Sequence, residues 1–286
     1  MSALVAASAL GALATALASL LLFASRRLTV EEDPRFAAVE AALPGVNCGA
    51  CGQPSCRAFA EALIAGTAVP AGCSVSTPDA RARIAGLLGV AVGTAARRVA
   101  RLACAGGRNR APFRAYYRGE RTCAAASQVA GGGKACSWGC LNFGDCVRAC
   151  HFDAMRLDEH GLPLVDETRC TACGDCVSAC PRDLFRLEPV SRALWVDCSN
   201  PESGDALLAV CSVACTACGR CAHDAPGAIR MTDNLPVVEP GTTNPPRAAI
   251  ERCPTGAIVW IENGRRQTGA AARHPARETD LPLAPQ

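Results

Sequence analysis

The sequence has few aromatic residues and little net charge. Phenylalanine, tyrosine and tryptophan make up 4% of the 286 residues, so a large aromatic-rich core is not expected. The formal net charge is only +3 and no long basic block is present, which argues against nucleic-acid binding as the main role. No nucleophile–base constellation stands out. No glycine-rich nucleotide loop lies between a strand and a helix, and the GGGK segment at 131–134 lacks the P-loop spacing.

Cysteine, by contrast, is abundant, with 20 residues in a chain long enough for two or three small domains. Cross-links must therefore replace much of the apolar core, either as disulfides or as metal clusters. Disulfide frameworks suit small secreted proteins. Most cysteines here come in pairs and triplets separated by two residues, and this spacing favours metal.

The N-terminus predicts a membrane anchor. Residues 2–24 carry no charge and would span about 34 Å as a helix, enough for the core of a bilayer. Arg26 and Arg27 follow directly, and no basic residue precedes the run. This charge bias predicts a single-pass anchor over residues 1–25 in the cytoplasmic membrane, with the rest of the chain in the cytoplasm. A cleaved signal peptide is the alternative.

A first cysteine group follows within a predicted small helical domain at 26–92. Its spacing, C-x2-C-x4-C-x16-C, suits a cubane [4Fe–4S] cluster, which needs four converging thiolates. Glycines allow the loop to fold tightly, and an apolar-periodic run from Cys56 predicts a helix that ends at Gly66. Zinc is the alternative, although zinc sites usually pair two C-x2-C knuckles. The expected ligands of this cluster 1 are Cys48, Cys51, Cys56 and Cys73.

A two-cluster ferredoxin unit is predicted at 136–188, after a connecting segment at 93–135. In such units the fourth cysteine of each loop binds the cluster of the other loop. Phe143 stands where the first loop would carry its middle cysteine, so Cys136 is the expected replacement. Strands are expected in a hairpin that turns at His160–Gly161 and in the segment LFRLEP. The expected ligands are Cys136, Cys140, Cys146 and Cys180 for cluster 2, and Cys150, Cys170, Cys173 and Cys176 for cluster 3.

A second ferredoxin-like unit is predicted at 189–262, with one of its two clusters lost. Ala225 stands where a fourth cysteine would precede Pro226, and the triplet expected before Cys253 is missing. Both losses remove ligands of the same cluster. The polar segment 263–286 is predicted to be a disordered tail. The surviving cluster 4 is expected to use Cys215, Cys218, Cys221 and Cys253.

Four cysteines remain, and they show an internal repeat. The spacing C-x12-C-x3-C begins at Cys123 and again at Cys198, and VARLAC and ALWVDC each read as a strand that ends in cysteine. A fifth cluster, with ligand exchange that involves Cys136, is one interpretation. Buried unligated thiols are the other. The residues concerned are Cys104, Cys123, Cys198 and Cys211.

The motifs ACSWGCLNFGDCVRAC and CSVACTACGRC, together with the first cysteine group, resemble the B subunit of Rnf electron-transport complexes. The resemblance implies an α+β chain: a transmembrane helix, a helical [4Fe–4S] domain and tandem ferredoxin-like units. It implies electron transfer from soluble ferredoxin to the membrane core of an ion-translocating ferredoxin:NAD oxidoreductase. The partners would be the other subunits of that complex. The chain itself would bind no flavin or NAD and have no separate catalytic site.

Two other functions remain open at this stage. The same architecture could serve a complex that reduces a redox-sensing regulator. A zinc-stabilised membrane scaffold would have no redox role.

Overall fold

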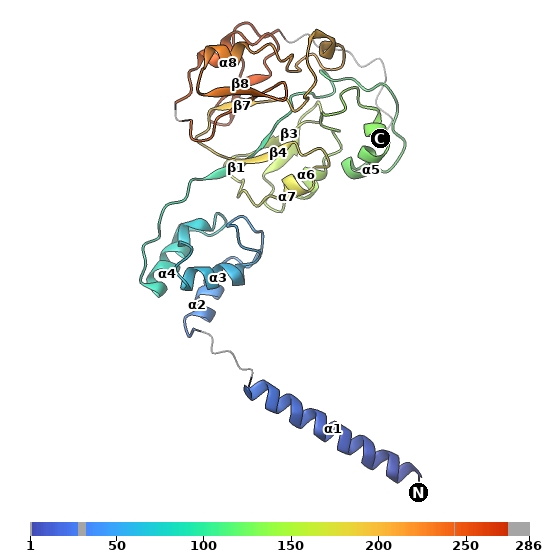
Figure 1. The fold of residues 1–286 in the computed structure, drawn as a ribbon, viewed down its shortest axis with the longest axis vertical. Coiled ribbons are helices and arrows are strands. Elements are labelled where there is room, and N and C mark those ends of the chain that lie inside the picture. The colour runs from blue at the N-terminus through green and yellow to red at the C-terminus, as the bar shows by residue number, and fades with distance from the viewer. Residues whose placement is uncertain (1, 28–32, 243, 274–286) are drawn as a thin grey trace.

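The protein is described by a computed structural model that covers residues 2–27, 33–242 and 244–273 (Figure 1). It mixes helices and short strands, as the α+β prediction requires. The first helix, α1 (Ser2–Arg27), contains a window at Ala7–Ser25 with a mean hydropathy of 2.0. Within the described part of the chain this window buries none of its surface. By length and composition, α1 can therefore cross a membrane.

A small helical domain follows α1. Its core contains Phe36, Val39, Phe59, Leu63 and Ile84, all buried. The helix predicted to begin at Cys56 is confirmed, and it ends two residues before Gly66. The helices are α2 (Phe36–Ala42), α3 (Cys56–Ile64) and α4 (Pro78–Leu88), with a 3₁₀ turn, η1, at Pro70–Gly72.

The next part of the chain is built around two antiparallel strand pairs. β1 pairs with β4, and β2 pairs with β3 in the predicted hairpin, where Gly161 takes a positive φ of 75°. The LFRLEP segment forms β4, as predicted. The elements are β1 (Arg98–Leu102), α5 (Cys123–Gln128), η2 (Ala130–Gly133), α6 (Asp145–Arg148), β2 (Met155–Leu157), β3 (Pro163–Val165), α7 (Asp175–Ser178) and β4 (Phe185–Pro189).

The last part repeats this order of strand, helix, hairpin, helix and strand. α9 begins 73 residues after α7, and β8 begins 73 residues after β4, whereas α8 begins 75 residues after α6. The two parts can therefore be aligned segment by segment. β5, β8 and β9 form one antiparallel sheet, and β6 pairs with β7. The elements are β5 (Leu194–Val196), η3 (Asp205–Ala209), α8 (Arg220–Asp224), β6 (Ile229–Thr232), β7 (Leu235–Val238), α9 (Ala248–Glu251), β8 (Ile258–Glu262) and β9 (Arg265–Gln267).

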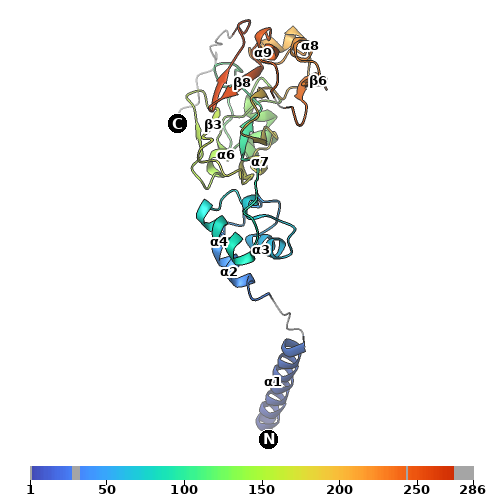
Figure 2. The ribbon, with the colours of Figure 1, turned by 90° about the vertical axis from the view of Figure 1, so that its left-hand side faces the viewer.

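The two strand-containing parts are joined where β1 and β5 end. The backbone N–H of Ala105 donates to the carbonyl of Asp197 at 3.0 Å, and the indole N–H of Trp195 donates to the carbonyl of Leu102 at 2.9 Å. In Figures 1 and 2 the α2–α4 domain lies between α1 and these two parts. The molecule thus places its helical domain nearest the apolar helix.

Part of the segment expected to be a disordered tail is ordered. β9 continues the sheet beyond β8, and the N–H of Ala271 donates to the carbonyl of Glu251 at 3.1 Å. The turn at Asn263–Gly264 allows this pairing, because both residues take positive φ values. Residues 274–286 of the expected tail lie outside the described residues.

Candidate metal centres

The first cysteine group converges on one cavity of about 320 Å³, which we call cavity 1. The loop closes because the side-chain oxygen of Asn47 accepts a hydrogen bond from the N–H of Cys56 at 2.8 Å. Gly49 and Gly52 take positive φ values, and the N–H of Gly52 donates to the carbonyl of Gly49 at 2.9 Å. Cavity 1 is lined by the four cysteines that were predicted from their spacing to share a cluster: Cys48, Cys51, Cys56 and Cys73.

The complete C-x2-C-x2-C-x3-C-P loop forms cavity 3, of about 320 Å³. Ala172, within this loop, takes a positive φ of 58°, and Gly174, with a φ of 95°, precedes α7. The backbone N–H of Ala100 in β1 donates to Sγ of Cys170 at 3.4 Å, a contact of the kind that stabilises a thiolate. The cysteines that line this cavity are the four that the sequence grouped: Cys150, Cys170, Cys173 and Cys176.

The loop that lacks its middle cysteine has the same backbone form. Asn142, with a φ of 64°, matches Ala172, and Gly144, with a φ of 79°, matches Gly174. Phe143 therefore occupies the position of the missing ligand, and its ring packs edge-on against Tyr117 with 5.7 Å between the ring centroids. A fourth donor for this loop has to come from outside it.

Cys123 is the cysteine from outside the loop that lies beside Cys140 and Cys146, in cavity 2 of about 370 Å³. It is the first residue of α5, which Thr122 caps by accepting a hydrogen bond from Ala125. The N–H groups of Cys123 and Ala124 donate to the carboxylate of Asp145 at 2.8 and 3.0 Å. Asp145 begins α6, so this contact fixes Cys123 beside Cys146. The cysteines that line cavity 2 are Cys123, Cys140, Cys146 and Cys180.

Cys136, which the sequence grouped with this loop, lies instead in cavity 5, of about 340 Å³. This cavity lies where the two strand-containing parts meet, and it takes two cysteines from each. Sγ of Cys104 accepts hydrogen bonds from the N–H groups of Gly106 at 3.3 Å and Cys140 at 3.5 Å. The structure thus exchanges Cys123 and Cys136 relative to the sequence grouping. Cavity 5 is lined by Cys104, Cys136, Cys198 and Cys211.

Cavity 4, of about 340 Å³, belongs to the last part of the chain. Ala217 has a φ of 60° and Gly219 a φ of 70°, so this loop repeats the form of the other two. Among the 20 cysteines, all within the described residues, Cys218 is the one that is exposed. The cavity is lined by the four cysteines that the sequence grouped: Cys215, Cys218, Cys221 and Cys253.

Apolar side chains fill the place where the last part would carry a second cavity. Alignment of the two parts puts Ala225 at the position of Cys150 and Ala249 at the position of Cys176. Both alanines are buried, with 0% and 1% exposure, and they pack with Ile250, Leu194 and Ile258. Burial of these side chains stabilises this region without a metal group.

Buried thiols in these cavities resist ionisation. Burial raises the pKa of Cys146 to about 12, and the neighbouring Cys123 and Cys180 add to the shift. Burial likewise raises the pKa of Cys176 to about 12, with Cys170 the next contributor. The thiols would remain protonated at neutral pH, so binding of a cationic group must displace their protons.

The cavities suit a group larger than one ion. A zinc ion would lie about 2.3 Å from each of its four sulfurs, so the thiols of a zinc site have to converge on a single point. Among the described residues, no group of three or more histidine, cysteine, aspartate and glutamate side chains is placed to hold a single metal ion. Four thiols around each cavity fit an iron–sulfur cubane, and in cavities 3 and 5 backbone N–H groups also donate to sulfur.

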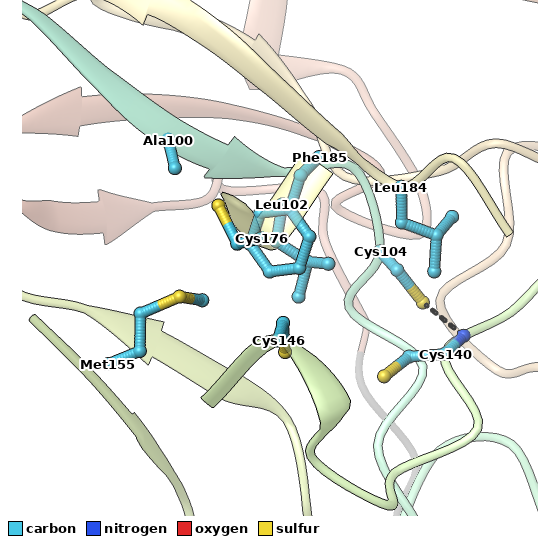
Figure 3. Packing of buried hydrophobic residues seen from close by; sticks show 9 residues of the cluster. All are labelled: Ala100, Leu102, Cys104, Cys140, Cys146, Met155, Cys176, Leu184 and Phe185. Atoms are coloured by element: carbon cyan, nitrogen blue, oxygen red, sulfur yellow. Dashed lines mark hydrogen bonds between the residues drawn. The ribbon is translucent and has the colours of Figure 1, made fainter. Parts of the chain in front are cut away.

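Neighbouring cavities are connected in a single order. Ser74, beside Cys73, donates its hydroxyl to the carbonyl of Thr171, beside Cys170, and so joins cavity 1 to cavity 3. Cys176 of cavity 3 packs in the same buried cluster as Cys146 of cavity 2 (Figure 3).

The same order continues into the last part of the chain. The N–H of Cys140, in cavity 2, donates to Sγ of Cys104, in cavity 5 (Figure 3). The N–H of Cys215, in cavity 4, donates to Sγ of Cys198, in cavity 5, at 3.4 Å. The cavities therefore follow one another in the order 1, 3, 2, 5 and 4.

Two protein families match parts of the chain. The family described as "Putative Fe-S cluster" matches residues 43–75, and the family described as "4Fe-4S dicluster domain" matches residues 135–185. The first match contains every cysteine of cavity 1. The second contains the cysteines of cavity 3 and three from cavity 2, but it begins after Cys123.

Curated relatives match most of the chain. The B subunit of the ion-translocating oxidoreductase complex of Methanosarcina acetivorans is 36% identical over 87% of this chain and 95% of its own length. The B subunit of the proton-translocating ferredoxin:NAD(+) oxidoreductase complex of Clostridium ljungdahlii is 38% identical over 85% of this chain and 87% of its own length. The corresponding protein of the Na(+)-translocating complex of Acetobacterium woodii is 38% identical over 68% of this chain, which spans 59% of that relative. The chain therefore belongs to the family of B subunits of Rnf-type ion-translocating oxidoreductase complexes.

Proposed function

We propose that this chain relays electrons through five [4Fe–4S] clusters, one in each cavity. The observation that carries the proposal is the division of all 20 cysteines into five sets of four, each set around its own cavity. A bound cluster of this kind accepts and releases one electron. The protein contributes the thiolates, the N–H donors to sulfur and the exclusion of water.

The proposed ligand sets follow the cavities. Cys123 replaces Cys136 in the second set, because it lies beside the position that Phe143 occupies. Cys136 then completes the fifth set. The proposed ligands are Cys48, Cys51, Cys56 and Cys73; Cys123, Cys140, Cys146 and Cys180; Cys150, Cys170, Cys173 and Cys176; Cys215, Cys218, Cys221 and Cys253; and Cys104, Cys136, Cys198 and Cys211.

The order of the cavities supports a direction for this relay. Cavity 1 lies in the domain that follows α1, and cavity 4 lies in the last part of the chain with the exposed Cys218. Exposure of a ligand leaves that end accessible to a soluble protein. We propose that soluble ferredoxin donates electrons at cavity 4 and that cavity 1 delivers them to subunits in the membrane.

The proposed setting is the cytoplasmic membrane, with α1 as a single-pass anchor and the remaining domains in the cytoplasm. Arg26 and Arg27 follow the apolar run and support this orientation. The names of the relatives support an ion-translocating ferredoxin:NAD oxidoreductase complex as the assembly. In that assembly this chain serves as an electron carrier, and NAD and flavin are bound by other subunits.

Anaerobic purification with iron and acid-labile sulfide analysis tests the number of clusters. We expect about twenty irons per chain, at about four irons per cubane. A chain with about sixteen irons would remove one set from the proposal, and a colourless, zinc-loaded chain would contradict it entirely.

A single substitution tests the link to electron transfer. Cys51→Ala removes one thiolate from cavity 1 and should interrupt electron flow from ferredoxin to NAD in membranes while leaving α1 inserted. Unchanged flow in these membranes would contradict the relay.

A further inference from the structure

Lys134 is the only lysine among the 29 lysine and arginine residues of the sequence, and it is buried, with 6% of its surface exposed. It follows η2, and its backbone forms a β-bridge with Phe113. A buried lysine requires partners for its ammonium group, because an unpaired charge in a protein interior is strongly unfavourable.

The ammonium group of Lys134 connects the loops of two cavities. Nζ donates to the carbonyl of Gly106 at 3.0 Å and to Oδ1 of Asn142 at 2.5 Å. Gly106 also donates its N–H to Sγ of Cys104 in cavity 5. Asn142 lies two residues after Cys140 of cavity 2. Lys134 therefore binds one residue that contacts the sulfur of Cys104 and one residue in the same loop as Cys140.

No carboxylate of the described residues pairs with this charge. In that part of the chain the polar contacts of Nζ are two neutral oxygens, and the ring of Phe113 lies 4.8 Å from it. Burial lowers the pKa of Lys134, and negative charge on the nearby sulfurs opposes that shift, so the ammonium form depends on the charge of the two cavities. The sulfurs concerned are those of Cys104, Cys140, Cys211 and Cys136.

We propose that Lys134 is a positioning and charge-balancing residue shared by cavities 2 and 5. The inference rests on the proposed function, since the compensating negative charge is that of thiolate-ligated clusters. A fixed positive charge favours the more negative, reduced state of a nearby cluster, so Lys134 raises the reduction potentials of both. It also offsets the repulsion between two neighbouring negative groups.

Redox titration of the anaerobically purified full-length protein, followed by electron paramagnetic resonance, tests this role. Lys134→Met keeps the length of the side chain and removes its charge. We expect two of the five midpoint potentials to become more negative while the other three stay unchanged. Arg83→Met, on the exposed face of α4, changes the net charge equally and should shift none of the potentials of cavities 2 and 5.

Two further variants keep the test decisive. Lys134→Arg preserves the charge and should keep both potentials closer to their original values than Lys134→Met does. Lys134→Gln retains a donor for the buried oxygens and carries the test if the methionine variant loses iron. Unchanged potentials in a fully loaded neutral variant would overturn the proposal, as would an equal shift in Lys134→Arg. Iron and sulfide counts report separately on the clusters themselves, so failure of the proposed function would be recognised.

Discussion

The carboxylate of Asp145 accepts a hydrogen bond from the backbone N–H of Cys123 at 2.8 Å, across 22 positions of sequence. This contact brings a cysteine from outside the ferredoxin-type loop into cavity 2. A second bond, from Ala124 at 3.0 Å, fixes the start of α5 in the same orientation. Asp145 therefore positions Cys123 in cavity 2, whose own loop carries Phe143 in place of its middle cysteine.

Asp145→Ala should weaken cavity 2. The variant leaves the N–H of the buried Cys123 without its acceptor, which costs about 1–3 kcal/mol, whereas water can replace the acceptor of the exposed Ala124. We expect slower reconstitution with iron and sulfide and the loss of up to four irons of about twenty per chain. Glu159→Ala is the control, since that side chain is 84% exposed. Equal iron content and equal reconstitution rates in the two variants would contradict a positioning role for Asp145.

Paired substitutions distinguish the two groupings of Cys123 and Cys136. Cys180 lines cavity 2. Cys123→Ala combined with Cys180→Ala should remove one cluster, about four irons, because both changes affect one site. Cys136→Ala combined with Cys180→Ala should remove two clusters, about eight irons. The reverse result would restore the grouping that the sequence suggested.

Ile250→Ala should destabilise the last part of the chain without changing its iron content. Ile250 is 1% exposed and packs beside Ala225. Removal of a buried isoleucine side chain to the β-carbon costs about 2–5 kcal/mol. Thermal unfolding of the loaded protein measures the effect, and Leu164→Ala, at a side chain that is 40% exposed, is the control. A loss of four irons from the Ile250 variant would contradict this expectation and would show that the apolar packing also supports cavity 4, because Cys221 lies in the same buried cluster.

Arg220→Glu should slow electron transfer from ferredoxin. Arg220 is exposed and lies two residues after Cys218, so its charge acts on a protein that docks at cavity 4. Charges at the rim of an interface mainly change association rates, and salt weakens the effect. We expect a severalfold lower second-order rate at low salt that converges with the unmodified protein at high salt. Arg83→Glu should leave the rate unchanged, and the same loss in both variants would contradict docking at cavity 4.

Several features could be predicted from the sequence because they depend on local spacing. The helix at Cys56, the hairpin around Gly161 and the strand LFRLEP all carry periodicity or turn signals. The four cysteines of cavity 1 are brought together by one short loop and one helix. In cavity 4 one loop carries Cys215, Cys218 and Cys221, and the proline after Cys253 marks the cysteine that joins them from a later segment.

Other features depended on contacts that spacing does not encode. Cys123 and Cys136 both precede the loop that begins at Cys140, and nothing in the spacing says which of them lines the cavity of that loop. Their separation follows from the Asp145 contact and from the meeting of the two strand-containing parts, both of which are tertiary. Lys134 had a recognisable signal, since it is the single lysine in an arginine-rich chain. Its burial between two cavities required the structure.

Cavity 5 takes its cysteines from both strand-containing parts, which affects when it can form during synthesis of the chain. Cys104 and Cys136 precede the second half of the chain, whereas Cys198 and Cys211 belong to it. The four thiols can therefore come together only after Cys211 has left the ribosome. Until then Cys104 and Cys136 of the nascent chain lack their partners in cavity 5. Iron and sulfide for the proposed cluster would have to be delivered after translation of this region, and a chain that stopped before Cys198 would end the order of cavities at cavity 2.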